Sequence, residues 1–206
     1  MNTLLRNSRA AAPDCVKAGI AFAALDYTLA PKASIAQIVQ ECRAAVADLR
    51  ASADQLGFDA NRIYVSGSSA GAHLAAMVAL AAPVAGVILV SGIYDLVPLV
   101  GTSINEALGL DAASAKANSP QAVIPAKAGI QKFPSSIVCW GEIETAEFKR
   151  QSNDYADLLI AQGTAVQRFE VPTKNHFDII LDLADPAALL GQATHALLQS
   201  SHPAHR

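Results

Sequence analysis

One serine of this chain lies at the centre of a five-residue pattern that can turn a hydroxyl into a nucleophile. In IYVSGSSAGAHLAAM (63–77), Gly67 and Gly71 stand two residues before and after Ser69. A serine attacks an acyl carbon only when it is held exposed, supplied with a base and faced by donors for the developing oxyanion. The G-x-S-x-G pattern, with a strand before it and a helix after it, predicts a tight elbow that exposes the serine. We therefore predict that Ser69 is a nucleophile.

The neighbours of this serine have different expected roles. The backbone N–H of Ala70 would lie at the start of the following helix, where it can donate to an oxyanion. Ser68 also has a hydroxyl, but in such an elbow its side chain points elsewhere. Ala70 is thus the predicted oxyanion donor, and Ser68 a bystander.

The base should come late in the chain, because triads on this kind of elbow run in the order serine, acid, histidine. His176 lies in VPTKNHFDII (171–180), in a loop between a predicted strand and Phe177, where an imidazole can move. The other histidines have simpler explanations as packed, helical or tail residues: His73, His195, His202 and His205. We predict His176 as the base.

Several carboxylates could orient that imidazole and stabilise its cation. VCWGEIETAEF (138–148) offers three, of which Glu147 falls in the first turn of a predicted helix and simply favours the helix dipole. Spacing alone leaves both Glu142 and Glu144 open. Asp95, after the preceding strand, is a further candidate, and Asp178 is expected to support the histidine loop locally.

Strands that alternate with helices must position these residues. Apolar runs bounded by turns predict strands, and apolar residues at helical spacing predict helices between them. This alternation indicates an α/β fold with a mostly parallel sheet, helices on both faces and chemistry at the carboxyl ends of the strands. The predicted strands are 19–27, 62–67, 85–96, 135–142 and 165–172, and the predicted helices are 34–57, from 70 onward, 147–162 and 186–199.

One region departs from the alternation. Residues 97–134 contain one short helical piece, SINEALGL (103–110), and then a stretch whose three prolines and glycine leave little room for a packed element. We expect an irregular surface excursion or partial lid within a single domain that spans 1–206.

Composition excludes several classes of partner. A length of 206 residues with 52% hydrophobic side chains suits one domain with a sizeable core, and a net charge of −3, scattered along the chain, gives no basic face for nucleic acid or lipid. The apolar run 74–90 is divided by Pro83 and Gly86, which predicts a helix, a turn and a strand rather than a membrane span. We expect a small-molecule acyl substrate, no nucleic acid and no membrane, and leave a homodimer open.

The cysteines and the amino terminus indicate a compartment. The three cysteines have no metal-ligand spacing and are an odd count: Cys15, Cys42 and Cys139. The first residues, MNTLLRNSRAAAPDC (1–15), have no apolar stretch long enough for a signal peptide. Both features favour a reducing cytoplasm.

Several of these segments together resemble the α/β-hydrolase fold, and specifically its arylformamidase (kynurenine formamidase) branch with related carboxylesterases. The segments are GSSAGAHLAAM, SGIYDLVPL, NEALGL, GEIETAEFKRQS and NHFDII, in this order. The resemblance implies a triad of Ser69, Glu144 and His176, although the family usually has aspartate where this chain has Glu144. It implies hydrolysis of a small acyl amide or ester, such as N-formylkynurenine, without a metal or organic cofactor.

The chain departs from that family at its amino-terminal side. Family members carry a His-Gly-Gly type segment whose N–H groups complete the oxyanion hole, and this chain contains no Gly-Gly pair. We therefore expect an amino-terminally truncated three-layer sandwich, with sheet edges exposed where a strand would separate 19–27 from 62–67. Three functions follow as hypotheses: an arylformamidase, a short-chain carboxylesterase, or a catalytically silent remnant.

Overall fold

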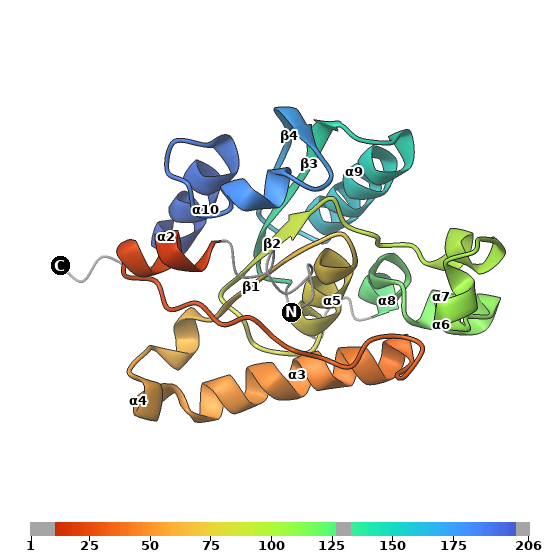
Figure 1. Ribbon diagram of the computed structural model, residues 1–206, viewed down its shortest axis with the longest axis horizontal. Coiled ribbons are helices and arrows are strands. Elements are labelled where there is room, and N and C mark those ends of the chain that lie inside the picture. The colour runs from red at the N-terminus through yellow and green to blue at the C-terminus, as the bar shows by residue number, and fades with distance from the viewer. Residues whose placement is uncertain (1–10, 127–132, 201–206) are drawn as a thin grey trace.

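The computed structural model describes residues 11–126 and 133–200 (Figure 1). In these ranges, four strands form one sheet in which every neighbouring pair is parallel, in the order β1-β2-β3-β4. The strands are β1 (Tyr64–Ser68), β2 (Gly86–Val90), β3 (Ser135–Ile143) and β4 (Val166–Asn175). Together with the helices below, they form an α/β-hydrolase fold, as the sequence predicts.

The helices follow the predicted alternation. The described α-helices are α2 (Ala12–Lys17), α3 (Ile35–Ala51), α4 (Ala53–Leu56), α5 (Ala70–Ala79), α6 (Asn105–Leu108), α7 (Ala112–Ala117), α8 (Pro120–Ala126), α9 (Ala146–Ala161) and α10 (Leu189–Ser200). Short 3-10 helices are η1 (Ala60–Arg62), η2 (Val97–Gly101) and η3 (Ile179–Asp182). None of the described helices is long and apolar enough to cross a membrane, and the apolar run 74–90 divides between α5 and β2.

Two apolar layers hold the sheet between helices. Successive side chains of a strand point to opposite faces, so Val87 and Leu89 pack into one core cluster while Ile88 and Val90 pack into another. The first cluster includes buried residues of α3, α5 and α9, and the second includes those of α2 and α10. Figure 1 shows the same division, with α10 and α2 on one side of the strands and α3, α5 and α9 on the other.

A capping box and a glycine set the two ends of the predicted helix over 34–57. The side chain of Ser34 accepts a hydrogen bond from the Gln37 N–H, and the Gln37 side chain accepts one from the Ser34 N–H, which forms a capping box at the start of α3. The predicted helix over 34–57 is broken at Ser52 and ends at Gly57, which has a φ of 77°. This conformation favours glycine because an L side chain there meets its own backbone.

The predicted strand at 19–27 is wrong. Residues 20–29 lack regular structure, and they pack against both core clusters in turn. Ile20 and Phe22 contact the cluster on the α10 side, whereas Leu25 and Tyr27 contact the cluster on the α3 and α5 side. The segment therefore passes around the edge of the sheet. An apolar run becomes a strand only where a neighbouring strand pairs with it, and among the described residues none pairs with it or with the outer edge of β1.

The region 97–134 is more helical than predicted. Besides α6, it contains α7, which begins with a capping box between Asp111 and Ser114, and α8, which begins at Pro120. Proline is accepted at the first position of a helix because the N–H that it lacks would have no partner there. Figure 1 shows α6 and α7 as a lobe beside the main body. Residues 127–132 of the predicted excursion lie outside the described residues.

Candidate active site

Each of the four described strands is followed by a polar side chain at the same edge of the sheet. Ser69 follows β1, Ser91 follows β2, Glu144 follows β3 and His176 follows β4. Because the strands are parallel, their carboxyl ends meet at one edge, where sites in open α/β sheets gather. The three residues predicted as a triad therefore share that edge with a second serine.

Ser69 occupies a strained elbow between β1 and α5. Its backbone has φ 57° and ψ −120°, a conformation that non-glycine residues rarely adopt, and its N–H donates to the Val90 carbonyl oxygen (2.9 Å). A Cβ on Gly67 would lie 2.2 Å from the carbonyl carbon of Gly71, so only glycine fits at position 67. A Cβ on Gly71 would meet nothing within 4 Å outside its own helix, so the elbow's steric requirement falls on Gly67.

The predicted oxyanion donor lies beside this serine. Ala70 is the first residue of α5 and is exposed, and its N–H has no acceptor among the described residues. The first N–H groups of a helix lack partners within it and point outward, where the helix dipole also favours negative charge. Ala70 can thus offer one donor to an oxyanion on a substrate bound at Ser69.

The Glu144 carboxylate is fully buried and heavily hydrogen-bonded. Its side chain is 0% exposed. Oε1 accepts hydrogen bonds from the Gly141 N–H (2.9 Å) and from the Ser91 hydroxyl, and Oε2 lies 3.1 Å from Nδ1 of His176. Burial by itself raises the pKa of this carboxyl, but hydrogen bonds from His176, Ser91 and Gly141 outweigh it and hold the pKa below its ordinary value. Glu144 is therefore a carboxylate at neutral pH.

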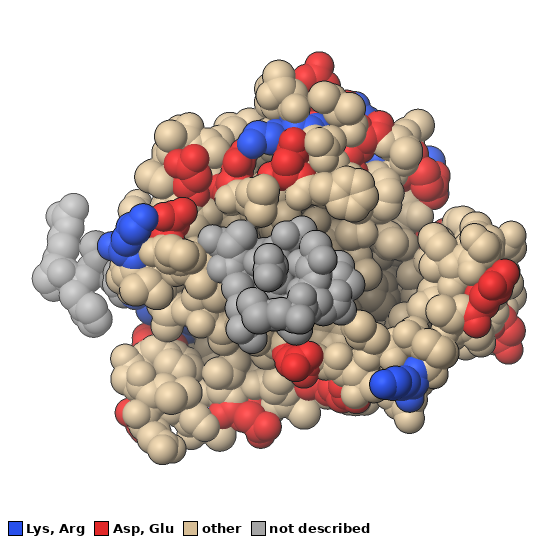
Figure 2. All heavy atoms as spheres, viewed as in Figure 1, with Lys and Arg blue, Asp and Glu red and all other residues tan. Residues whose placement is uncertain are grey.

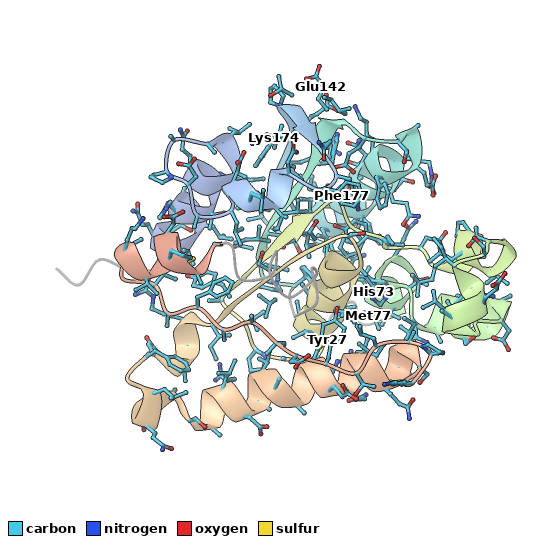
Figure 3. The ribbon with its side chains drawn as sticks, viewed as in Figure 1. Tyr27, His73, Met77, Glu142, Lys174 and Phe177 are labelled. Atoms are coloured by element: carbon cyan, nitrogen blue, oxygen red, sulfur yellow. The ribbon has the colours of Figure 1, made fainter. Side chains whose placement is uncertain are left out.

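His176 is held so that one ring nitrogen is committed and the other is available. With Nδ1 donating to Glu144, the neutral imidazole keeps Nε2 as a proton acceptor. The ring packs against Phe148 of α9 with centroids 4.2 Å apart and meets the edge of Phe177 at 5.3 Å. Phe177 is 77% exposed, and Figure 3 shows it near the carboxyl ends of the strands.

The structure brings the predicted acid and base together, but it does not join the serine to them. In the part of the chain that the structure describes, no hydrogen bond links Ser69 Oγ to His176. The triad therefore remains a prediction that rests on one hydrogen-bonded pair and one strained serine at a common edge. Catalytic hydrogen bonds are often long in the absence of substrate and tighten when substrate binds.

A register shift between β3 and β4 separates the two glutamates that spacing left open. The shift falls between Gly141 and Ile143, where β3 and β4 pair irregularly. Within it, Glu142 Oε2 accepts a hydrogen bond from the Thr173 N–H (2.7 Å), and after it Glu144 meets the imidazole. Thr173 has a φ of 62°, a strained value for a β-branched residue, so Glu142 is engaged in holding the end of β4.

The remaining carboxylate candidates have other partners. Glu147 binds Arg150, and hydrogen bonds from Arg150 and Gln151 lower the pKa of Glu147 to about 2. Asp95 accepts from the Val97 N–H (3.0 Å) within its own turn. Asp178 accepts hydrogen bonds from the backbone and side chain of Asn175, which shapes the loop that carries the histidine.

Neither His73 nor His195, the other described histidines, is hydrogen-bonded to Glu144 or His176, and neither is the second elbow serine. His73 is buried on α5, its Nε2 lies 2.7 Å from the Asn118 carbonyl oxygen, and burial lowers the pKa of its imidazole. His195 on α10 lies 3.3 Å from the Ala184 carbonyl oxygen through Nε2. The hydroxyl of Ser68 makes no hydrogen bond with the described residues. His202 and His205 lie outside the described residues.

Ser91 is the site residue that the sequence reasoning missed. It is the first residue after the buried run VILV of β2 and precedes Gly92. A polar residue at the carboxyl end of a buried parallel strand is a signal that could have found it.

The described residues hold no arrangement suited to a metal ion. Among them, no group of three or more His, Cys, Asp or Glu side chains could hold one. The three thiols are free and buried, and burial raises the pKa of Cys42 to about 11.

On the face in Figure 2, acidic and basic side chains are scattered among uncharged ones, and the surface is hollowed between the main body and the lobe of α6 and α7.

Comparison with known proteins follows the same lines. The profile of the BD-FAE family matches residues 5–136, more than half of the chain. The chain belongs to the BD-FAE family. The matched span includes the Ser69 elbow and the end of β2, whereas Glu144 and His176 lie beyond it.

Relatives of this BD-FAE member include formamidases and esterases. It is 32% identical over 179 residues to kynurenine formamidase of Salmo salar, covering 82% of this chain and 60% of that protein. It is 28% identical over 204 residues to carboxylesterase NlhH of Mycobacterium tuberculosis, covering 86% and 63%. The crystal structure of carboxyl esterase 2 from Tuber melanosporum has a TM-score of 0.77 at 21% identity, covering 95% and 73%, and shows the fold alone. The chain thus spans about 60% of the length of these curated relatives.

Proposed function

We propose that this chain hydrolyses small acyl substrates with Ser69 as nucleophile, His176 as general base and Glu144 as the acid that orients the base. One observation carries the proposal: a buried carboxylate is hydrogen-bonded to a partly exposed imidazole at the sheet edge where a serine sits in a strained elbow. This combination meets the conditions for an activated hydroxyl.

The proposed reaction has two stages. Nε2 of His176 accepts the hydroxyl proton while Oγ of Ser69 attacks the acyl carbon, and the imidazolium then gives that proton to the leaving amine or alcohol. An acyl-enzyme remains. Water, deprotonated by the same imidazole, attacks it, and the acid product and the free serine are released. Glu144 stays ionised throughout and stabilises the imidazolium.

The oxyanion of each tetrahedral intermediate would be met by the Ala70 N–H. Removing one donor from an oxyanion hole typically lowers turnover about 100- to 1000-fold. With Ala70 as the one identified donor, we expect slower turnover than that of a relative with a complete hole.

The substrate class that we propose first is an aryl formamide such as N-formylkynurenine. Its support is the resemblance of the triad segments to arylformamidases and the 32% identity to a kynurenine formamidase. A short-chain carboxylesterase is the second candidate, favoured by the similarity to carboxylesterase NlhH. The same triad serves both, and release of formate from an amide or of an alcohol from an ester distinguishes them.

The test compares hydrolysis of p-nitrophenyl acetate and N-formylkynurenine by the wild-type chain, Ser69→Ala and Ser68→Ala. Ser68→Ala is the matched control, because it removes a hydroxyl from the same elbow. We expect turnover in the wild type and in the control, and a fall to the buffer rate in Ser69→Ala. Circular dichroism shows whether each sample is folded.

Two results would contradict the proposal. Equal turnover by Ser69→Ala would assign the activity to another group. A folded wild type that turns over neither substrate would indicate the third hypothesis, a hydrolase scaffold without its reaction.

A further inference from the structure

Ser91 occupies a position that is unusual in three ways. It is 0% exposed, and its backbone φ of 50° lies in the left-handed region that serine seldom adopts. Its N–H donates to the Cys139 carbonyl oxygen of β3 (2.8 Å), which ties the end of β2 to the neighbouring strand. Its hydroxyl donates a hydrogen bond to Oε1 of Glu144, a buried carboxylate.

The geometry points to Ser91 as a positioning residue of the proposed reaction, which holds the Glu144 carboxylate in place for His176. The inference rests on the proposed function for its catalytic meaning. The hydrogen bond from Ser91, after β2, to Glu144, after β3, does not depend on whether the chain turns over a substrate.

A buried carboxylate needs hydrogen-bond donors from the protein. Glu144 has no exposed side-chain surface, so its lone pairs depend on protein donors. Gly141 N–H and the Ser91 hydroxyl both bind Oε1, which leaves Oε2 directed at Nδ1 of His176. Without the hydroxyl, Oε1 keeps a single donor and the carboxylate can rotate. Ser91 thus acts on the base through the acid.

The left-handed backbone at Ser91 supports a site role rather than a packing role. A serine at positive φ is less stable than one in an ordinary backbone conformation, and glycine would remove that cost. The strain is accompanied by a hydroxyl aimed at the one buried carboxylate that meets an imidazole. Strained residues of this kind cluster at functional sites.

The titratable groups around the carboxylate are few. Those with an electrostatic interaction with Glu144 are His176 after β4, Cys139 on β3 and Tyr94 after β2, whereas Glu147 on α9 is paired with Arg150. Burial raises the pKa values of Cys139 and Tyr94, so both stay neutral in the acidic range. The acid limb of a pH profile would therefore report the Glu144–His176 pair.

The experiment uses Ser91→Ala and Ser91→Gly. Both remove the hydroxyl, but glycine also relieves the backbone strain, so it remains available if the alanine variant fails to fold. Ser136→Ala is the matched control: Ser136 is also a buried serine, 2% exposed, but it lies at the amino end of β3, where its hydroxyl donates to the Pro134 carbonyl oxygen.

We expect kcat/KM to fall about 10- to 100-fold in both Ser91 variants, the range of one hydrogen bond to a charged group, with KM little changed. The acid limb of the pH profile should move to higher pH, because the reaction needs Glu144 ionised and His176 neutral. Losing the Ser91 donor removes one cause of the low pKa of Glu144, so this carboxyl becomes harder to ionise. A packing defect would lower activity equally at every pH.

A second readout does not depend on turnover. Carbon-13 NMR of labelled glutamate follows the Glu144 carboxyl, assigned by its absence in Glu144→Gln, and its pKa should rise in both Ser91 variants but not in Ser136→Ala. An unchanged titration and an unchanged acid limb would overturn the inference. A wild type without turnover would overturn the proposed function instead, and the carboxyl titration would then decide whether Ser91 holds Glu144.

Discussion

The β3–β4 side and the β1 side of the sheet hold their site residues in different ways. On one side, β3 and β4 have nine and ten residues, and their ends are tied by backbone N–H groups that donate to the carboxylates of Glu142, Glu144 and Asp178. On the other side, β1 has five residues, its outer edge has no neighbour among the described residues, and Ser69 is held by backbone packing at Gly67. The acid–base pair is thus positioned by polar contacts and the serine by steric ones, so the two should fail under different substitutions.

The largest expected effect separates the two glutamates of the β3–β4 side. Glu144→Gln keeps the shape but removes the charge that stabilises the imidazolium, and we expect kcat to fall about 10⁴-fold, as in other triads. Glu142→Gln keeps an acceptor for the Thr173 N–H and should change kcat less than about tenfold. Steady-state kinetics on p-nitrophenyl acetate would check this. A larger loss in Glu142→Gln would reverse the assignment of the acid.

A steric substitution tests the β1 side. Gly67→Ala places a Cβ 2.2 Å from the backbone of Gly71, which cannot move without disrupting α5, so we expect about 4 kcal/mol or more of destabilisation. Gly71→Ala is the control, because its Cβ meets nothing outside the helix and alanine favours helical backbone. Urea denaturation measures both. Similar stability of the two variants would mean that the elbow relaxes.

Hydrogen exchange tests whether the β1 edge is open in solution. The parallel register directs the N–H groups of Val65 and Gly67 toward β2 and that of Ser66 away from it. We expect the Ser66 amide to exchange at least about 100-fold faster than its two neighbours in NMR exchange experiments. Protection of Ser66 would show that another strand, from this chain or from a second copy, pairs with that edge.

The smallest effect concerns acid stability on the β3–β4 side. The Glu144 carboxyl has a pKa below its ordinary 4.5 in the folded chain, because hydrogen bonds from His176, Ser91 and Gly141 outweigh burial. Its contribution to the free energy of unfolding is therefore present above pH 4.5 and is lost as the pH falls through the lower folded value. We expect the stability difference between wild type and Glu144→Gln to shrink over that range, measured by urea denaturation. A difference independent of pH would contradict this.

Features that depend on nearby residues were predictable from the sequence, whereas features that depend on distant parts of the chain were not. The elbow, the strands that follow it, the start of α3 and the ends of α9 were predictable, because glycines, caps and apolar periodicity act within a few residues. The break after α3 at Ser52 was not predicted. The predicted strand over 19–27 was wrong, since strand formation depends on a partner that local sequence does not contain. The helices α7 and α8 were not predicted, because prolines and small residues usually interrupt helices. Pro120, however, stands at the start of a helix.

By itself, the sequence determined which residue types are available for the chemistry and the order in which they occur: a serine in a glycine elbow, a cluster of glutamates and a late histidine. The tertiary structure brings Glu144 rather than Glu142 to His176 and adds Ser91 beside it. Because both glutamates lie within three residues of sequence, spacing alone does not distinguish them. The register shift between β3 and β4 directs Glu142 to the Thr173 backbone and Glu144 to the His176 imidazole. Ser91 joins them because neighbouring parallel strands, distant in sequence, end at one edge.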